Sequence, residues 1–196
     1  MKKLCLVVCV SLLFTACGGG AGTNSGSTGG SGSAPTKMEI TVYGKTQTFE
    51  PKTGMLEISQ TGSDGGADTY GEYNVFLGNV EMKEELFNKP LTSAEDVRLL
   101  FALARKKGTG RKTPMEAETF PVNGSWPLIN DAMVKTFDGN RTIDSWGHEA
   151  PNKDWKGEVK ITAVNGDLAT GEVDLKFGDK ISIKGPFTAK VKPPRQ

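Results

Sequence analysis

Histidine and cysteine are scarce in this sequence, and their scarcity limits the chemistry that it can support. The 196 residues include one histidine, His148, and three cysteines. A single histidine excludes metal sites built from several histidines, and any Ser/His/Asp or Cys/His catalytic unit would have to use His148. An excess of one charge is also lacking, because 24 Lys and Arg residues stand against 23 Asp and Glu residues. This balance argues against a general nucleic-acid-binding protein.

Long hydrophobic runs are absent as well, apart from a short one at the N-terminus. Two lysines, Lys2 and Lys3, precede the apolar residues 4–16. A helix of that length would span about 20 Å, which is too short to cross a hydrocarbon core of about 30 Å. Residues 1–16 are therefore predicted to be a signal peptide.

The end of this apolar segment indicates the kind of signal. Residues 13–17 read Leu-Phe-Thr-Ala-Cys, which resembles the lipobox of bacterial lipoprotein precursors. The resemblance implies cleavage before Cys17 and acylation of its thiol. The other two cysteines, Cys5 and Cys9, would leave with the signal peptide, so Cys17 would have no disulfide partner within the mature chain. The alternative is an ordinary secretory signal in which Cys17 is incidental.

Acylation would anchor the protein without a membrane-spanning helix. Each buried CH₂ group contributes about 0.8 kcal/mol, so two or three acyl chains hold a soluble domain at a membrane. In lipoproteins of Gram-negative bacteria, Asp directly after the acylated cysteine commonly signals retention in the inner membrane. Gly18 occupies this position, so the resemblance implies the outer membrane of a Gram-negative source, on its periplasmic face or at the cell surface.

Composition divides the remaining chain into a tether and one domain. Residues 18–34 consist almost only of Gly, Ser, Thr and Ala, with eight glycines and no charged residue. Such a segment behaves as a flexible coil, so residues 17–36 are predicted to be a lipidated tether. Residues 37–196 are predicted to form a single β-rich domain, which is long enough to bury a core without disulfides.

Alternation of apolar and polar residues predicts strands in most of this domain. Residues 157–191 alternate in this way and are interrupted by Asn165-Gly166 and Gly178-Asp179, which favour tight turns. The pattern predicts an antiparallel meander of three or four strands with one apolar and one charged face. Further short strands are predicted at residues 38–43, 46–50, 55–59 and 69–77.

A helix is predicted among these strands. Thr92 and Glu95 have the spacing of a capping box, and basic residues 105–107 before Gly108 suit the negative end of a helix. One apolar stripe lies between them, made of Val97, Leu100, Phe101 and Ala104. Residues 81–88 offer a second, shorter helix. The predicted fold class is therefore α+β and mainly β, an antiparallel β-sandwich or meander with one or two helices.

The C-terminal pattern and the lipobox together resemble many predicted bacterial lipoproteins of the cell envelope. These chains combine a lipobox, a Gly/Ser-rich tether and a β-rich domain, and most have no assigned function. The segments that carry the resemblance in the domain are residues 157–161, 164–167, 171–177 and 185–189. The resemblance implies a surface lipoprotein with a β-rich domain and transfers no catalytic residue.

Two groups of residues are candidate binding sites. The first is a basic segment made of Arg105, Lys106, Lys107, Arg111 and Lys112. In the envelope it would suit lipid head groups, lipopolysaccharide, cell-wall polymers or acidic proteins, unless it only complements the end of the predicted helix. The second group is made of the three tryptophans Trp126, Trp146 and Trp155. Exposed, they would stack on sugar rings, whereas buried they would form a satellite core.

Other patterns point to catalysis or metal binding but lack a complete motif. His148 lies in a loop-like segment near Asp144 and Glu149 and could act as a general base, yet no Gly-x-Ser-x-Gly nucleophile elbow is present. The acidic, glycine-containing residues 64–68 and 138–144 could bind calcium, but they lack the twelve-residue loop spacing and are equally typical of turns. No catalytic residue, metal site or cofactor is therefore predicted.

These features predict an outer-membrane-anchored lipoprotein that presents a non-enzymatic, β-rich binding or assembly module in the cell envelope. Its expected partners are the membrane, through the N-terminal lipid, and an envelope protein or polysaccharide; nucleic acid is not expected. The alternative is an envelope carbohydrate-binding or hydrolytic protein that uses the tryptophans together with His148 or carboxylates.

Overall fold

The computed structural model describes residues 37–62, 67–80, 82, 89–123, 126–137, 142–146 and 154–192. The predictions for the signal peptide, Cys17 and the tether lie outside these residues. The described residues belong to one compact unit, Ser33–Gln196. Among them, no helix has the length and apolar character needed to pass through a membrane.

The described part of the chain contains eleven β-strands and no helix. The strands are β1 (Met38–Val42), β2 (Lys45–Phe49), β3 (Lys52–Thr61), β4 (Tyr70–Gly78), β5 (Val97–Ala104), β6 (Glu118–Pro121), β7 (Leu128–Phe137), β8 (Thr142–Trp146), β9 (Trp155–Asn165), β10 (Leu168–Phe177) and β11 (Ile181–Lys192). The predicted β-rich character is therefore confirmed.

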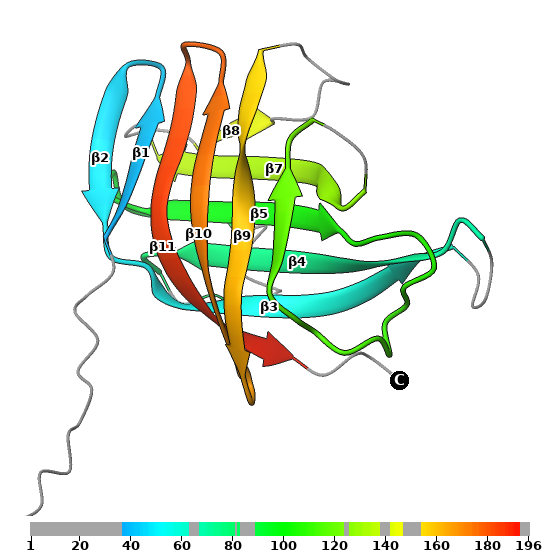
Figure 1. Cartoon of the computed structure of the whole chain (residues 1–196). Helices are drawn as coiled ribbons and strands as arrows, with labels where there is room; N and C mark the ends of the chain where they lie inside the picture. The colour runs from blue at the N-terminus through cyan, green and yellow to red at the C-terminus, as the bar shows by residue number, and fades with distance from the viewer. Residues whose placement is uncertain are drawn as a thin grey trace, which may run out of the picture. The chain divides into compact units, whose positions relative to one another are not determined.

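The strands form two layers that run crosswise to each other (Figure 1). The hydrogen-bonded order is β6-β9-β10-β11-β3-β4-β5-β7-β8, with β1 paired to β11 and β2 paired to β1. We term β2, β1, β11, β10, β9 and β6 the front layer, and β3, β4, β5, β7 and β8 the back layer. Apart from the parallel pair of β11 and β3, neighbouring strands are antiparallel.

Strand β11 connects the two layers because it bends in its middle. Its first residues pair with β1 in the front layer, and its last residues pair with β3 in the back layer. Gly185 lies between these two parts with φ +139°, and a Cβ atom there would lie 2.9 Å from the Cα atom of Met38. Only glycine fits this close approach without a shift of the backbone.

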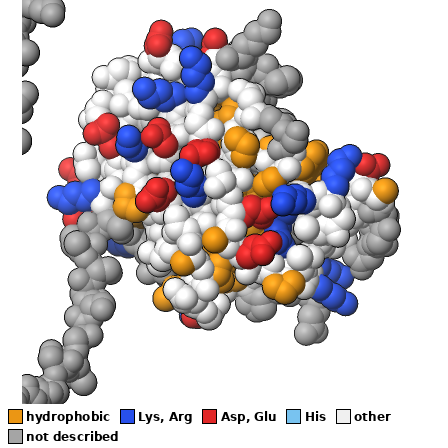
Figure 2. Space-filling view, viewed as in Figure 1, with side chains coloured by type: hydrophobic (Ala, Val, Ile, Leu, Met, Phe, Trp, Pro, Cys, Tyr) orange, Lys and Arg blue, Asp and Glu red, His pale blue; other side chains and the backbone are white. Residues whose placement is uncertain are grey.

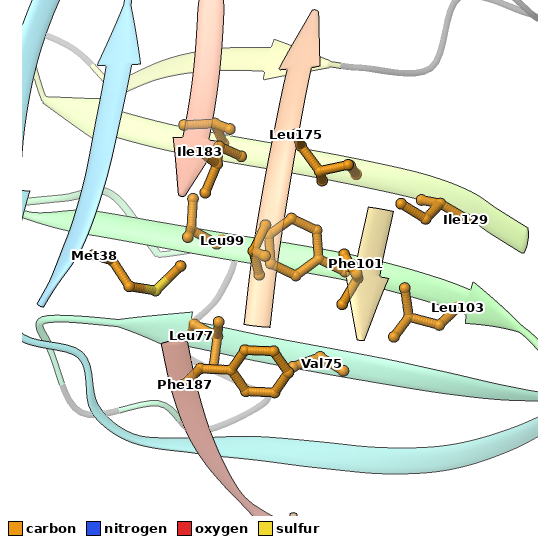
Figure 3. Packing of buried hydrophobic residues seen from close by; sticks show 14 of the residues in the cluster. Met38, Val75, Leu77, Leu99, Phe101, Leu103, Ile129, Leu175, Ile183 and Phe187 are labelled. Atoms are coloured by element: carbon orange, nitrogen blue, oxygen red, sulfur yellow. The ribbon is translucent and has the colours of Figure 1, made fainter. Parts of the chain in front are cut away.

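The hydrophobic core lies between the layers. Figure 3 shows Leu175, Ile183 and Phe187 of the front layer packed toward Leu99 and Phe101 of the back layer. All five side chains are at most 1% exposed. Full burial of one such side chain contributes about 1.5–3 kcal/mol, so this cluster is the main source of stability.

The C-terminal meander is confirmed as three antiparallel strands, β9, β10 and β11. Buried and outward-facing positions alternate along β10, as expected for a sheet with one apolar and one charged face. The first turn differs in detail from the prediction. Asn165 pairs with Leu168, so the turn residues are Gly166 and Asp167, and Gly166 carries the positive φ of +63°.

The predicted helix around residues 92–107 is wrong, because residues 97–104 form strand β5. Seven of the eight β5 residues are buried, since both faces of this central strand are covered. Leu99 and Leu103 face the main core, whereas the alternate residue Leu100 packs in a second cluster with Phe76 and Met133. A strand buried on both faces is apolar at almost every position, so it also satisfies helical spacing.

The predicted capping residues belong to a turn before β5. The Asp96 carboxylate accepts hydrogen bonds of 3.0 Å from the backbone N–H groups of Thr92 and Ser93, while Glu95 caps no helix. This is the side-chain-to-backbone pairing of a turn rather than of a capping box. Of the shorter helix predicted at residues 81–88, only Met82 is described.

Candidate binding site

Arg105 is buried, which removes it from the predicted basic surface. Its side chain is 1% exposed, and its Nε donates to the Glu118 carboxylate at 3.3 Å. Its Nη1 and Nη2 atoms donate to the backbone oxygens of Thr113 and Pro114 at 3.2 and 3.1 Å. The guanidinium carbon also lies 4.9 Å from the centre of the Tyr73 ring. Arg105 is therefore not available to an anionic partner.

These contacts fix the long connection between β5 and β6 against the end of the back layer. The backbone N–H of Arg105 donates to Gly71 of β4 at 2.9 Å, and the Gly71 N–H donates to the Thr109 hydroxyl at 3.0 Å. The backbone N–H of Arg111 donates to the side chain of Gln60 in β3 at 3.1 Å. The connection is thus held by hydrogen bonds to both β3 and β4.

The remaining basic residues lie at or near the surface of this connection. Lys106, Lys107 and Lys112 are exposed, and Arg111 is partly exposed. Lys107 pairs with Asp68 across the end of the layer at an Nζ–Oδ1 distance of 2.6 Å. The hydrogen bond from Lys107, with its positive charge, lowers the pKa of Asp68 below its usual value.

Trp126 lies beside these residues. Its ring contacts that of Tyr70 with a centroid separation of 4.3 Å and an interplanar angle of 53°. The Nζ atom of Lys107 lies 6.0 Å from the centre of the Trp126 ring, within the range of a cation–π interaction. We term Asp68, Tyr70, Lys107 and Trp126 the aromatic–basic site.

Strand register explains why these two rings meet. Ala104 of β5 pairs with Glu72 on one side and with Leu128 on the other. Tyr70 precedes Glu72 by two residues and Trp126 precedes Leu128 by two residues, so the chain brings both residues to the same end of β5. Trp126 and the basic segment were predicted separately as candidate sites, whereas Tyr70 was not, because its only signal was its place in an aromatic-rich strand.

Polar side chains adjoin the aromatic–basic site on the outer face of the back layer. The Asn130 amide donates to the Glu72 carboxylate at 3.0 Å, and the Asn74 amide donates to the Ser59 hydroxyl at 3.0 Å. Amides, hydroxyls and a carboxylate beside these partly exposed rings provide hydrogen-bond partners for a polar ligand.

The other two tryptophans occupy different places. Trp155 of β9 packs edge-on against Phe177 of β10, with ring centroids 4.5 Å apart, in the front layer. Trp126 instead contacts Tyr70 at the end of the back layer. For Trp146 the structure describes only the backbone, which pairs with Met133 in β7. The contacts of Trp126 and Trp155 therefore do not form one platform.

Several predicted candidates fall outside the described residues. These include His148, Glu149 and the acidic, glycine-containing residues 64–66 and 138–140. Within the described ranges, no group of three or more His, Cys, Asp or Glu side chains is placed to hold a metal ion.

A second polar surface covers the outer face of the front layer. Strands β9, β10 and β11 line a depression of about 390 Å³ there. Acidic and basic side chains are interspersed on this face (Figure 2). Glu158 pairs with Lys160 at 2.6 Å, and Asp174 pairs with Lys184 at 3.4 Å. The hydrogen bond from Lys160 to Glu158, with the charge of that carboxylate, raises the pKa of Lys160. Much of the charge in the depression is thus neutralised internally.

No protein-family model, curated protein or solved structure matches this chain.

Proposed function

We propose that this protein is a lipoprotein anchored in the bacterial outer membrane, whose β-rich domain is a non-enzymatic binding or assembly module of the cell envelope. The observation that carries the binding role is the convergence of Tyr70, Lys107 and Trp126 at one end of the back layer. Aromatic side chains provide large contact areas with little conformational freedom to lose, which suits a ligand-binding surface.

The buried Arg105 supports this role by holding the site in place. Its hydrogen bonds to Thr113, Pro114 and Glu118 order the connection that carries Lys107. A site that is ordered before its ligand arrives avoids part of the entropy cost of binding.

The anchor is tested by labelling cells with a fatty-acid analogue. We expect the wild-type protein to take up the label and the Cys17→Ser variant to lose it, because the thiol is the acylation point in the lipobox pattern. Undiminished labelling of the variant would contradict the lipoprotein assignment. The result does not depend on the binding site.

The binding role is tested by affinity capture from the protein's own envelope. Full-length wild-type protein, Trp126→Ala and Lys107→Gln are compared, with Lys106→Gln as the matched control. We expect the first two variants to lose a component that wild type and control retain, with all four proteins giving the same far-UV circular dichroism. If all four capture the same components in the same amounts, the aromatic–basic site is not the binding surface.

A saccharide ligand is favoured by one further observation. The Asn130–Glu72 amide–carboxylate pair adjoins the Tyr70–Trp126 rings, and this combination suits sugar hydroxyls and sugar ring faces. Screening envelope polysaccharides for affinity and for cleavage, with Trp126→Ala and His148→Ala as controls, separates binding from hydrolysis. Cleavage that requires His148 would replace the non-enzymatic proposal with a hydrolase.

A further inference from the structure

Two lysines face each other on the outer surface of the front layer, and neither is paired with an acidic residue that the structure describes. Lys156 of β9 and Lys176 of β10 are direct partners in the strand register, and both are exposed. Within the described part of the chain, neither makes an ion pair or a side-chain hydrogen bond. Like charges directly opposite each other destabilise a sheet, so this pair has a cost that its own surroundings do not offset.

The nearest acids along the same face are already paired with other lysines. Glu158 and Asp174 follow the lysine pair in register. Glu158 contacts Lys160 at 2.6 Å and Asp174 contacts Lys184 at 3.4 Å. Both carboxylates are thus engaged by lysines other than Lys156 and Lys176.

Hydroxyl side chains follow the two lysines, position by position in the strand register, across the front layer. Lys176 pairs with Ser182 of β11, Ser182 pairs with Thr41 of β1, and Thr41 pairs with Thr46 of β2. The hydroxyls of Thr41 and Thr46 lie 2.8 Å apart. With a strand spacing of about 4.8 Å, the five positions extend over roughly 19 Å. We term Lys156, Lys176, Ser182, Thr41 and Thr46 the lysine–hydroxyl row.

Tyr43 lies in the turn at one end of this row. It is 60% exposed and has φ +48°, a backbone conformation that Gly or Asn adopts more readily. Its backbone N–H donates to Lys180 at 2.7 Å, which joins the β1–β2 and β10–β11 turns. Along the edge of the front layer that carries these two turns and the start of β9, the exposed charges are Lys45, Lys156, Lys176 and Lys180 against Asp154 and Asp179.

We propose that the lysine–hydroxyl row binds a linear acidic polysaccharide. The lysines would pair with its carboxylates, the hydroxyls would bond its sugar hydroxyls, and Tyr43 would contact a ring face. The row contains no apolar side chain, which favours a glycan over a lipid surface that binds through buried apolar area. This site lies on the front layer, so the proposal does not depend on the aromatic–basic site of the back layer.

The test uses full-length protein in a neutral polyoxyethylene detergent, titrated calorimetrically with a six-unit oligogalacturonate. We expect Lys156→Gln/Lys176→Gln to weaken binding by about tenfold or more, because the loss of one charge-assisted contact already changes the affinity by about this factor. The control Lys190→Gln/Lys192→Gln removes two exposed lysines from β11 and makes the same change in net charge. It is expected to bind as the wild type does.

Three results would overturn the proposal. The first is equal weakening in both double variants, which would show general charge attraction. The second is the absence of wild-type binding to the oligogalacturonate. The third is row-dependent binding to vesicles of phosphatidylglycerol but not to the oligosaccharide, which would make the partner a membrane.

Tyr43→Asn separates function from folding, because it is expected to weaken binding while raising the melting temperature.

Discussion

At the scale of single residues, Arg105 shows how a buried charge is compensated. The guanidinium is surrounded by the Glu118 carboxylate, two backbone oxygens and the face of Tyr73. Each of these groups offsets part of the cost of removing the charge from water. A second carboxylate, that of Glu116, approaches to 3.8 Å from the solvent side.

Replacement of Arg105 is therefore expected to be costly. Arg105→Ala should lower the free energy of unfolding by about 3–5 kcal/mol, because Glu118 would keep a largely buried charge without its partner. Urea denaturation followed by tryptophan fluorescence measures the change. The neighbouring Lys106→Ala, at an exposed position, is the control and should alter stability by about 0.5 kcal/mol or less. A loss below about 1 kcal/mol for Arg105→Ala would contradict a structural role.

Tyr73 provides a pH-dependent test of the same buried region. Burial raises the pKa of its phenol above the usual value of about 10, and the charge of Arg105 only partly opposes this. The folded state then holds the phenolic proton more tightly than the unfolded state. The contribution of this phenol to the free energy of unfolding is fully present below about pH 10. It decreases by about 1.4 kcal/mol per pH unit as the pH rises further.

We expect Tyr73→Phe to remove this dependence. Urea titrations at pH 9 and pH 11 give the slope of the unfolding free energy for the wild type and the variant. Tyr43→Phe, at a position that is 60% exposed, is the matched control. Equal slopes for the wild type and Tyr73→Phe would show that the Tyr73 phenol does not control alkaline stability.

The basic segment can be predicted from the sequence, but the exposure of each of its residues cannot. Arg105 and Lys106 are neighbours of the same charge, yet one is buried and the other is exposed. The difference depends on Tyr73 and Glu118, which lie 32 and 13 positions away in the chain. No local pattern contains such tertiary partners.

At the scale of elements, the number of solvent-facing sides of a strand explains why β10 was predicted correctly and β5 was predicted as a helix. The front-layer strand β10 has one buried and one solvent-facing side, so its alternating pattern identifies it directly. The back-layer strand β5 is covered on both sides and has no polar face. Its apolar residues therefore satisfy helical and extended spacing equally, and only the tertiary structure decides between them.

The burial of Leu99 and Leu103 differs between strand β5 and the helix that was predicted for the same residues. In the helix both would lie on the side away from the apolar stripe, whereas in β5 both are fully buried. Leu103→Ala is expected to reduce the unfolding free energy by about 2–5 kcal/mol, measured in urea. Leu168→Ala, which truncates a leucine that is 42% exposed, should cost far less. Similar small effects at both positions would be inconsistent with β5.

At the scale of the whole molecule, the near-zero net charge conceals two local excesses of positive charge. One is the basic segment around Lys107 at the end of the back layer, and the other is the Lys156–Lys176 pair on the front layer. The crosswise arrangement of the layers assigns them to different faces. Neither the bend of β11 at Gly185 nor its parallel pairing with β3 was foreseen, because both depend on contacts between distant segments.

This separation predicts that the two surfaces bind independently. Effects of substitutions at distant sites without shared partners usually add, so each set of variants should affect one ligand only. Trp126→Ala is expected to leave oligogalacturonate affinity unchanged, and Lys156→Gln/Lys176→Gln should leave affinity capture of the envelope component unchanged. A four-way comparison of wild type, both variants and their combination in the two assays measures this. If Trp126→Ala weakened oligogalacturonate binding as strongly as Lys156→Gln/Lys176→Gln does, one continuous binding surface would have to join the two layers.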